Sequence, residues 1–310
     1  MHTIFGPINS RRFGVSLGID LSPFSKQCDF DCLYCELAPM IAMDKQVQVI
    51  ELSTIINELK THLDDTIDVI TITANGEPTL YPHLNELIDE INKIKNSTQT
   101  LILSNSASLT KQEVFNALLK LDQVKLSLDA VSQDIFKKID RPHPSLSISK
   151  IIDSIIKFSK VFTGKLFIEI LFVKDINDKE DEIEKLNQVL KQINATRIDI
   201  GTIDRPPAYD VKPLSYQELH AISLMFDANL PIHIVQRKTE KPSHNSYDEE
   251  EILNTLDKRA LTKDDIELLF DKESKSKLEK LIENKKVLTK TISNVDFLVP
   301  CTHIARKRTK

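Results

Sequence analysis

Short apolar runs alternate with amphipathic segments over about the first 200 residues of the chain. The runs are rich in Ile, Val, Leu and Phe, which is typical of strands buried on both faces of a parallel sheet. They lie at Phe13–Leu21, Ile67–Ala74, Thr100–Ser104, Val124–Leu128, Leu166–Val173 and Arg197–Ile203. Strands that alternate with helices predict βα units joined by right-handed crossovers.

The segments between these strands carry apolar residues three and four positions apart, the spacing of an amphipathic helix. The predicted helices are Leu52–Leu63, Leu84–Lys95, Lys111–Leu121, Ser149–Phe158 and Lys179–Ile193. Six βα units fit an α/β fold with a partial or complete (β/α)6 barrel, and a doubly wound open sheet is the alternative. In both arrangements the loops after the strands carry the chemistry.

The pattern changes after the sixth strand. A helix at Leu214–Phe226 and a short strand at Ile232–Val235 complete a first domain, residues 1–235. The polar stretch 236–248 is a predicted linker. Residues 249–300 then predict three helices and a hairpin, which is the layout of a winged helix; a helical cap on the barrel is the alternative. The predicted elements are Glu249–Lys258, Lys263–Phe270, Ser274–Asn284, Val287–Lys290 and Val295–Val299, with a turn at Ser293-Asn294 and a basic tail at 301–310.

Composition and charge narrow the class of protein. The 310 residues are 41% hydrophobic and 28% charged, as in ordinary globular proteins. The net charge of −5 provides no overall basic field for nucleic acid, so any such contact must come from local patches. No apolar run reaches the roughly 18 residues of a membrane span, and the first residues lack a signal-peptide layout. We therefore expect a cytoplasmic protein without a membrane partner, in which four cysteines do not form a disulfide framework.

Three of the four cysteines lie within eight residues. Cys28, Cys32 and Cys35 have the spacing C-x3-C-x2-C and directly follow the first predicted strand. Thiolates are soft ligands that suit iron–sulfur clusters or zinc. Structural zinc takes four protein ligands, whereas three thiolates on a four-iron cluster leave one iron open to a substrate or cofactor. A zinc site completed by the distant Cys301 or by a histidine is the alternative.

The cysteine loop resembles the signature of the radical S-adenosylmethionine (SAM) superfamily, C-x3-C-x-aromatic-C, with Tyr34 in the aromatic position. After the second predicted strand, Asn75-Gly76-Glu77-Pro78 is similar to the Gly-Gly-Glu-like motif of the same family. The resemblance covers about residues 1–235 and implies a partial, TIM-like (β/α)6 radical SAM barrel. It also implies a [4Fe–4S] cluster held by Cys28, Cys32 and Cys35, with SAM as the second cofactor.

The resemblance further implies how the cofactors act. A one-electron donor such as flavodoxin or ferredoxin reduces the cluster, SAM is cleaved to methionine and a 5′-deoxyadenosyl radical, and the radical abstracts hydrogen from the substrate. Ser127 and Asp129 lie two positions apart, so they share a face if the strand continues that far. The implied SAM-site residues are Tyr34, Asn75, Gly76, Glu77, Pro78, Asn105, Ser127 and Asp129.

Three further stretches concern the substrate. Residues 6–12, 75–80 and 204–208 resemble a small bacterial branch of iron–sulfur oxidoreductases related to the archaeal tRNA enzyme that makes the tricyclic wyosine base. That relative uses a second cluster bound by extra N-terminal cysteines, and this chain has no cysteine before Cys28. The resemblance therefore carries over the radical chemistry rather than the substrate.

Basic residues give a weaker indication of the substrate than the motifs give of the cofactors. Arg11, Arg12, Arg141 and Arg205 fall near the predicted rim, where arginine suits phosphate or carboxylate; surface positions or loop-fixing ion pairs are the alternative. Lysines crowd the third C-terminal helix and its surroundings, at 275, 277, 280, 285, 286 and 290, although acidic residues interleave with them.

Three functional hypotheses follow. The first is a radical SAM enzyme that acts on RNA, foremost tRNA. The second is a radical SAM enzyme that acts on a small molecule, a peptide or a partner enzyme. The third is a redox-sensing regulator with a cluster and a DNA-binding winged helix, which would need no SAM pocket.

Overall fold

The computed structural model describes residues 2–10, 13–235, 246–258, 260–292 and 295–301. Its main element is an eight-stranded sheet whose spatial order, β1 to β8, follows the order of the chain. The strands are β1 Ile4–Ser10, β2 Gly14–Asp20, β3 Val69–Thr73, β4 Gln99–Ser104, β5 Gln123–Ser127, β6 Lys165–Phe172, β7 Arg197–Thr202 and β8 Ile232–Ile234. From β2 to β8 each strand is parallel to its neighbours, and β1 pairs antiparallel with the edge of β2.

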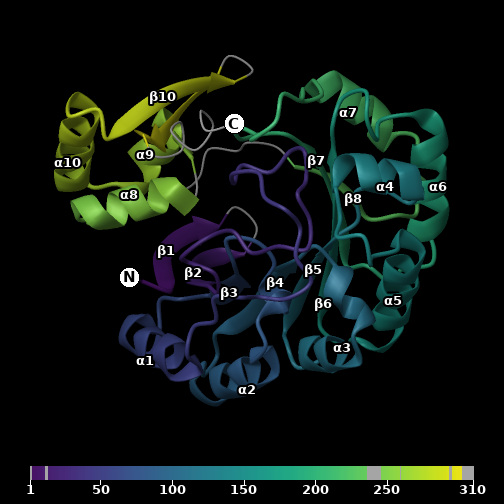
Figure 1. The fold of residues 1–310 in the computed structure, drawn as a ribbon, viewed down its shortest axis with the longest axis horizontal. Coiled ribbons are helices and arrows are strands. Elements are labelled where there is room, and N and C mark those ends of the chain that lie inside the picture. The colour runs from purple at the N-terminus through teal and green to yellow at the C-terminus, as the bar shows by residue number, and fades with distance from the viewer. Residues whose placement is uncertain (1, 11–12, 236–245, 259, 293–294, 302–310) are drawn as a thin grey trace.

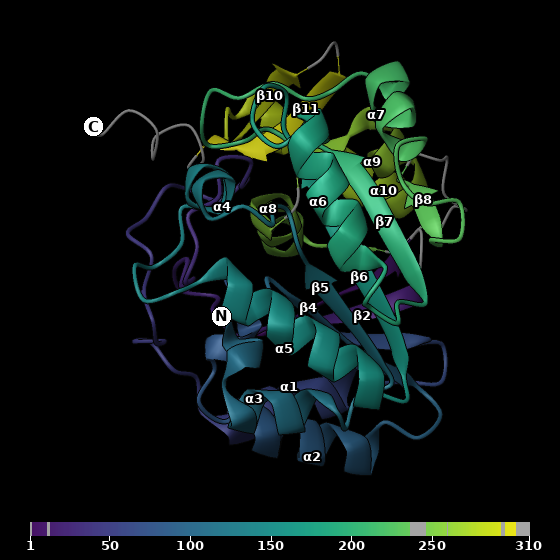
Figure 2. The same ribbon diagram turned by 90° about the vertical axis from the view of Figure 1, so that its right-hand side faces the viewer.

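The helices that connect these strands lie on the outside of the sheet, which curves into an open barrel (Figure 1). They are α1 Leu52–His62, α2 Leu84–Ile94, α3 Gln112–Leu118, α4 Gln133–Ile139, α5 Ile148–Val161, α6 Glu180–Leu190 and α7 Tyr216–Ser223. Figure 2 shows α5 and α6 lying along the strands that they join. Because the strand order never reverses, the doubly wound alternative is wrong and the TIM-like prediction is confirmed.

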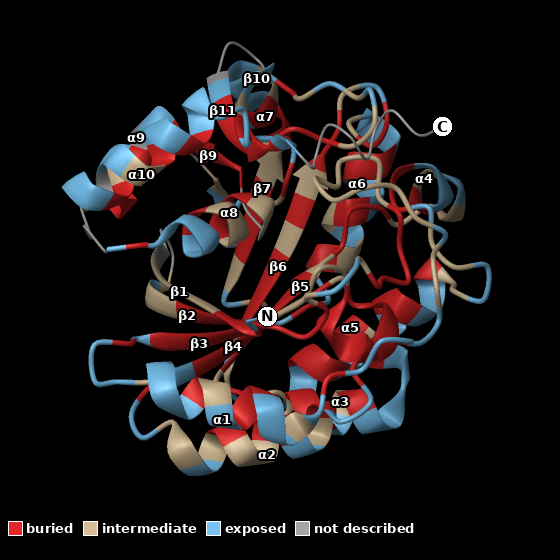
Figure 3. Cartoon of the chain, turned by 60° about the vertical axis from the view of Figure 1, so that its left-hand side comes forward, coloured by how far each residue is buried: buried red, intermediate tan, exposed pale blue. Residues whose placement is uncertain are grey.

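Burial explains why these segments form strands and helices. Strand residues such as Ile70 and Ile102 are fully buried between the barrel interior and the helices. The helices are buried on one side only, as the apolar stripe of Leu87 and Ile91 on α2 illustrates. Figure 3 shows this division, with red strands inside and pale blue outer faces on α1 and α2. No helix among the described residues is long and apolar enough to span a bilayer.

The C-terminal residues form a second, smaller group of elements. They are α8 Glu249–Lys258, β9 Leu261–Thr262, α9 Lys263–Leu269, α10 Lys272–Glu283, β10 Val287–Ile292 and β11 Val295–Pro300. The three predicted helices and both hairpin strands are present, and the additional strand β9 pairs antiparallel with β11. A buried cluster that includes Ile252, Phe270 and Leu281 forms the core of this group. The winged-helix assignment and the domain limits stay predictions, because 236–245 of the linker, the turn at 293–294 and 302–310 of the tail lie outside the described residues.

The C-terminal group lies beside β1 (Figure 1). Ile8 of β1 packs against its buried cluster, and the Tyr247 hydroxyl donates a hydrogen bond of 3.3 Å to the Pro7 carbonyl. The edge of the barrel formed by β1 is therefore joined to the C-terminal elements.

Candidate functional site

The three clustered cysteines lie on the loop that leaves β2 at the carboxyl end of the sheet. Cys28 is buried, while Cys32 and Cys35 are partly exposed. The Cys35 amide donates to the Cys32 carbonyl over 3.1 Å. Burial, assisted by Asp140 and by the other two thiols, raises the pKa of Cys32 well above its usual value. The three thiols therefore lie close enough together to interact electrostatically.

Helix α4, which the sequence pattern did not predict, holds this loop in place. The amide of Asp31 donates to the Asp140 carbonyl over 3.0 Å, and the amide of Leu33 donates to Ile139 over 2.8 Å. The His143 amide donates in turn to the Asp29 carbonyl over 2.8 Å. Three backbone hydrogen bonds thus fasten the cysteine loop to the end of α4.

A second attachment joins the cysteine loop to the segment after β3. The Gln27 amide donates to the Asn75 carbonyl, and the Glu77 amide donates to the Gln27 carbonyl, both over 2.9 Å. Between them Gly76 has φ +135°, and a Cβ there would stand 1.9 Å from the Gln27 carbonyl oxygen. Glycine is therefore required at this position for the two segments to meet.

The Glu77 carboxylate accepts hydrogen bonds from neighbouring residues. One carboxylate oxygen accepts from the Thr79 hydroxyl over 2.6 Å and from Ser104 over 2.8 Å, and the other accepts from the Asn105 amide over 2.7 Å. Burial and the charge of Asp29 raise its pKa to about 7. Glu77 thus shapes the pocket by joining the loops after β3 and β4, and Pro78 begins a buried turn of 3-10 helix behind it.

The amide side chain of Asn105 also points toward the cysteine loop. Its Nδ2 donates to Asp29 over 2.6 Å and lies 3.8 Å from the Cys28 sulfur. Burial raises the pKa of Asp29 to about 6. The predicted rim residue Asn105 therefore lies beside a candidate cluster ligand.

Strand β5 ends at Ser127, so Asp129 lies beyond it and does not share its face as a regular strand would require. Asp129 instead accepts hydrogen bonds from the Tyr34 hydroxyl and, over 2.7 Å, from the Leu171 amide. Burial raises the pKa of Asp129 to about 7. Asp129 and Tyr34 therefore join the cysteine loop to the ends of β5 and β6. Ser127 is half-buried, and its backbone carbonyl accepts a hydrogen bond from the Ser106 hydroxyl.

Two of the four predicted substrate arginines lie in ion pairs. Arg205 bonds Glu36 over 2.6 Å, next to Cys35. Arg141 lies 3.6 Å from Asp31, with its guanidinium 4.6 Å from the centre of the Tyr209 ring. Arg11 and Arg12 lie outside the described residues. The contacts of Arg141 and Arg205 are thus ion pairs that fix loops, which was the alternative to substrate binding.

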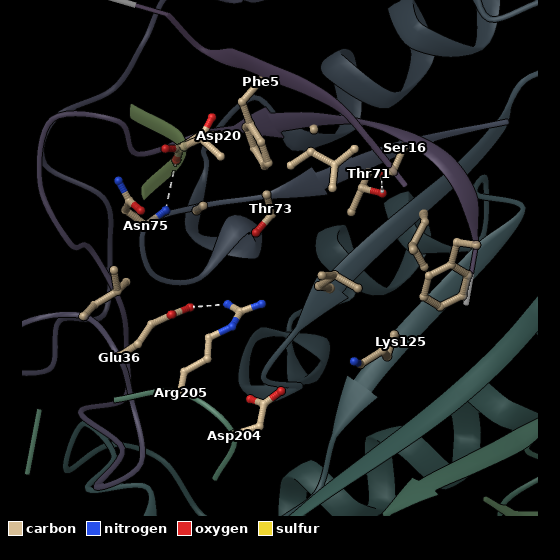
Figure 4. Close-up of a pocket in the computed structure, with 18 of the residues that line it drawn as sticks. Phe5, Ser16, Asp20, Glu36, Thr71, Thr73, Asn75, Lys125, Asp204 and Arg205 are labelled. Atoms are coloured by element: carbon tan, nitrogen blue, oxygen red, sulfur yellow. Dashed lines mark hydrogen bonds and ion pairs between the residues drawn. The ribbon is translucent and has the colours of Figure 1, made fainter. Parts of the chain in front are cut away.

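A cavity of about 410 Å³ opens from this site into the barrel (Figure 4). Asn75 and the Glu36–Arg205 pair line it, and the Lys125 ammonium points into it from β5. Lys125 pairs with Glu169 on the neighbouring strand β6. We did not identify these two residues from the sequence, although a charged residue inside an otherwise apolar strand is a signal that can be read there.

The residues present fit a [4Fe–4S] cluster. Among the described residues, no three Cys, His or acidic side chains stand as the ligands of a single metal ion. Iron–sulfur clusters are held by cysteine thiolates. Cys301, by contrast, is exposed at the end of β11 in the C-terminal group. Three soft donors on one short loop are therefore chemically suited to a [4Fe–4S] cluster.

Comparisons with known proteins agree with this arrangement. The model of the radical SAM superfamily matches residues 22–186. The chain is 40% identical over 298 residues to a UPF0026 protein of Helicobacter pylori, which covers 95% of this chain and 96% of the relative. It is 29% identical over 169 residues to the GTP 3′,8-cyclase of the same organism, covering 54% of this chain and 50% of the cyclase.

The fold has a counterpart among solved structures. Streptococcus suis SuiB bound to S-adenosylmethionine superposes with a TM-score of 0.51 at 18% identity. The match covers 71% of this chain and 48% of SuiB. The chain belongs to the radical SAM superfamily and is an enzyme whose cofactors are a [4Fe–4S] cluster and SAM.

Proposed function

We propose that this enzyme cleaves SAM reductively and uses the product to abstract hydrogen from a substrate held in the barrel cavity. Cys28, Cys32 and Cys35 hold the cluster, and the segment from Asn75 to Pro78 borders the SAM site. The observation that carries this proposal is the bridge between Gln27 and Gly76, since it joins the thiol loop to a segment whose Asn75 lines the cavity.

When bound, the cluster and SAM supply a one-electron cleavage of the sulfonium. The chain supplies position and enclosure. Asn105 and Tyr34 orient the cysteine loop from two sides, through Asp29 and Asp129. The apolar side chains of Leu101 and Leu103 line the barrel interior.

The test is an anaerobic assay of the reconstituted full chain with a reductant and SAM. We expect 5′-deoxyadenosine and methionine from the wild type and neither from Cys32→Ala, whereas Cys301→Ala keeps its iron and activity. If Cys301→Ala lost iron to the same extent as Cys32→Ala, the three-thiolate site would be wrong. An intact cluster that binds no SAM would favour the redox-sensor hypothesis.

Radical SAM enzymes need an electron donor, and for this one we propose flavodoxin or ferredoxin. For the substrate we propose RNA, foremost tRNA. The support is a set of exposed lysines at the end of α10 and just after it, Lys280, Lys285 and Lys286, since such groups contact phosphates. Lys275 and Lys277 contribute less, because they pair with Glu267 and Glu273.

Binding of total tRNA, measured by anaerobic gel shift at several salt concentrations, tests the RNA proposal. Replacement of Lys280, Lys285 and Lys286 by Glu should weaken binding at least tenfold. The matched control is the same replacement of Lys150, Lys157 and Lys160, which are exposed on α5. Equal loss in both variants, or no binding by the wild type, would contradict it.

A small molecule is the second candidate, because of the cavity. Its volume of about 410 Å³ lies in the range of small-molecule sites. Phe5 and Ile8 of β1 and Thr255 of α8 cover it. Three carboxylates and two cations line it, namely Asp20, Glu36, Asp204, Lys125 and Arg205, which disfavours a phosphate chain inside. Cleavage of SAM that depends on a small-molecule fraction of cell extract, and not on RNA, would support this candidate.

A further inference from the structure

Lys26 is a lysine buried beside the cysteine loop. Its side chain is 8% exposed, and its Nζ lies 3.3 Å from Oδ1 of Asp31, a carboxylate that is itself 4% exposed. Lys26 precedes Cys28 by two residues, and Asp31 lies between Cys28 and Cys32 in the cysteine loop. A positive charge is thus held among the three candidate ligands.

The ion pair keeps Lys26 charged, because a carboxylate 3.3 Å away favours the ammonium form.

Asp31 does not cancel this charge by itself. The same carboxylate accepts from the Tyr209 hydroxyl and from the Met40 amide, and it faces Arg141 at 3.6 Å. Two cations therefore share one carboxylate on this side of the loop.

Acidic side chains lie on the other sides of the cysteine loop. The Cys32 sulfur is 3.5 Å from Asp140, and Asn105 lies between the Cys28 sulfur and Asp29. Lys26 is therefore a buried positive charge in a largely acidic loop.

We propose that Lys26 raises the reduction potential of the cluster. Reduction adds one electron, and a fixed cation beside the ligands stabilises the more negative, reduced form. Solvent screens this charge poorly, because Lys26 and its partner Asp31 are 8% and 4% exposed. A donor of modest reducing power then suffices. This inference rests on the proposed function, in that the cluster must be held by Cys28, Cys32 and Cys35.

The experiment is a redox titration of the reconstituted full chain, followed by electron paramagnetic resonance of the reduced cluster. SAM is omitted, so that its binding does not enter the result. For Lys26→Gln we expect the ratio of reduced to oxidised cluster at the wild-type midpoint to fall about tenfold, a shift of about −59 mV for a one-electron couple. Lys26→Arg, which keeps the charge, should stay within about threefold of the wild type. Lys45→Gln is the matched control, because Lys45 is exposed in the segment that follows the cysteine loop.

A variant of opposite sign separates charge from structural damage. Asp31→Asn keeps the side-chain shape and removes a negative charge, so its midpoint should rise, and the double variant Lys26→Gln/Asp31→Asn should lie near the wild type. Midpoints of both single variants equal to the wild type would overturn the proposal, as would shifts in the same direction. Loss of iron from both variants would also overturn it, because Lys26 and Asp31 would then be structural. A wild type that binds no cluster would instead refute the proposed function.

Discussion

Gly76 is the residue at which the two sequence motifs touch. Its φ of +135° belongs to the region that favours glycine, and the Gln27 carbonyl occupies the space of a side chain. The requirement is local and steric, and it exists before any ligand binds. The resemblance to the family implies that Gly76 also borders SAM, so this residue contributes both to the fold and to the site.

Gly76→Ala should therefore destabilise the protein and reduce its iron content. We expect a loss of more than about 1 kcal/mol in the free energy of unfolding, because alanine is strained at this φ and its Cβ meets backbone. Urea unfolding of the apoprotein and iron analysis after reconstitution measure the two effects. Gly201→Ala is the control, since its Cβ would meet only Val235, at 3.8 Å. Equal midpoints for both variants would show that the close approach does not matter.

At the scale of elements, helix ends are stabilised by charge and by hydrogen bonds. Helix α7 begins with a capping box in which the Ser215 hydroxyl accepts from the Glu218 amide and Glu218 accepts from the Ser215 amide. Glu218 also pairs with Lys174, over 2.7 Å, on the loop after β6. The hydrogen bond from Lys174, with those from Ser215, lowers the pKa of Glu218 to about 2.

This pair predicts a pH dependence of stability. A carboxyl whose pKa is lowered on folding stabilises the native state above its unfolded pKa, about 4.5, and loses that contribution as the pH falls toward 2. The free energy of unfolding of the wild type minus that of Glu218→Gln should thus be constant near neutral pH and shrink below about pH 4.5. Urea titrations between pH 7 and 3 measure it. The pH dependence of this stability difference should be weaker when Lys174→Gln is also present. A stability difference that grows in acid would contradict the lowered pKa of Glu218.

The elements that the sequence predicts are those with a strong apolar period. The six barrel strands and their longer helices were found because each buries a regular face. Strand β1 was missed, since it contains Gly6-Pro7 and owes its conformation to pairing with β2. Helix α4 has seven residues, of which Phe136 and Ile139 are buried, too few to establish a period.

The site residues that can be predicted are those that lie in contiguous motifs. The cysteines and the segment from Asn75 to Pro78 are contiguous, so their chemistry can be read locally. Lys125 forms an ion pair with Glu169 on another strand, and Arg205 forms one with Glu36 on a distant loop. Such pairs depend on the register of the sheet and on loop geometry, which no single stretch of sequence contains.

At the scale of the whole molecule, the C-terminal group closes one side of the barrel. It contributes Thr255 to the lining of the cavity, and its buried cluster receives Ile8 from β1. The contact therefore connects β1 to the C-terminal elements beside the cavity.

Ile8→Ala should loosen this contact and leave the barrel intact. We expect faster hydrogen exchange in α8 and α10 and unchanged exchange in β3 and β4, because the lost methyl groups pack on the C-terminal cluster. Exchange measured by mass spectrometry resolves these segments. Ile41→Ala is the control, since Ile41 is 91% exposed. Uniform acceleration throughout the chain would indicate global destabilisation instead.

The same closure has a consequence for synthesis. The ribosome makes the cysteine loop and β3 early, whereas Thr255, which covers part of the cavity, comes more than two hundred residues after Cys35. A nascent chain whose parallel strands have already assembled therefore has a barrel cavity that Thr255 does not yet line. Access to this cavity is widest during that interval, before the last helices of the protein are translated.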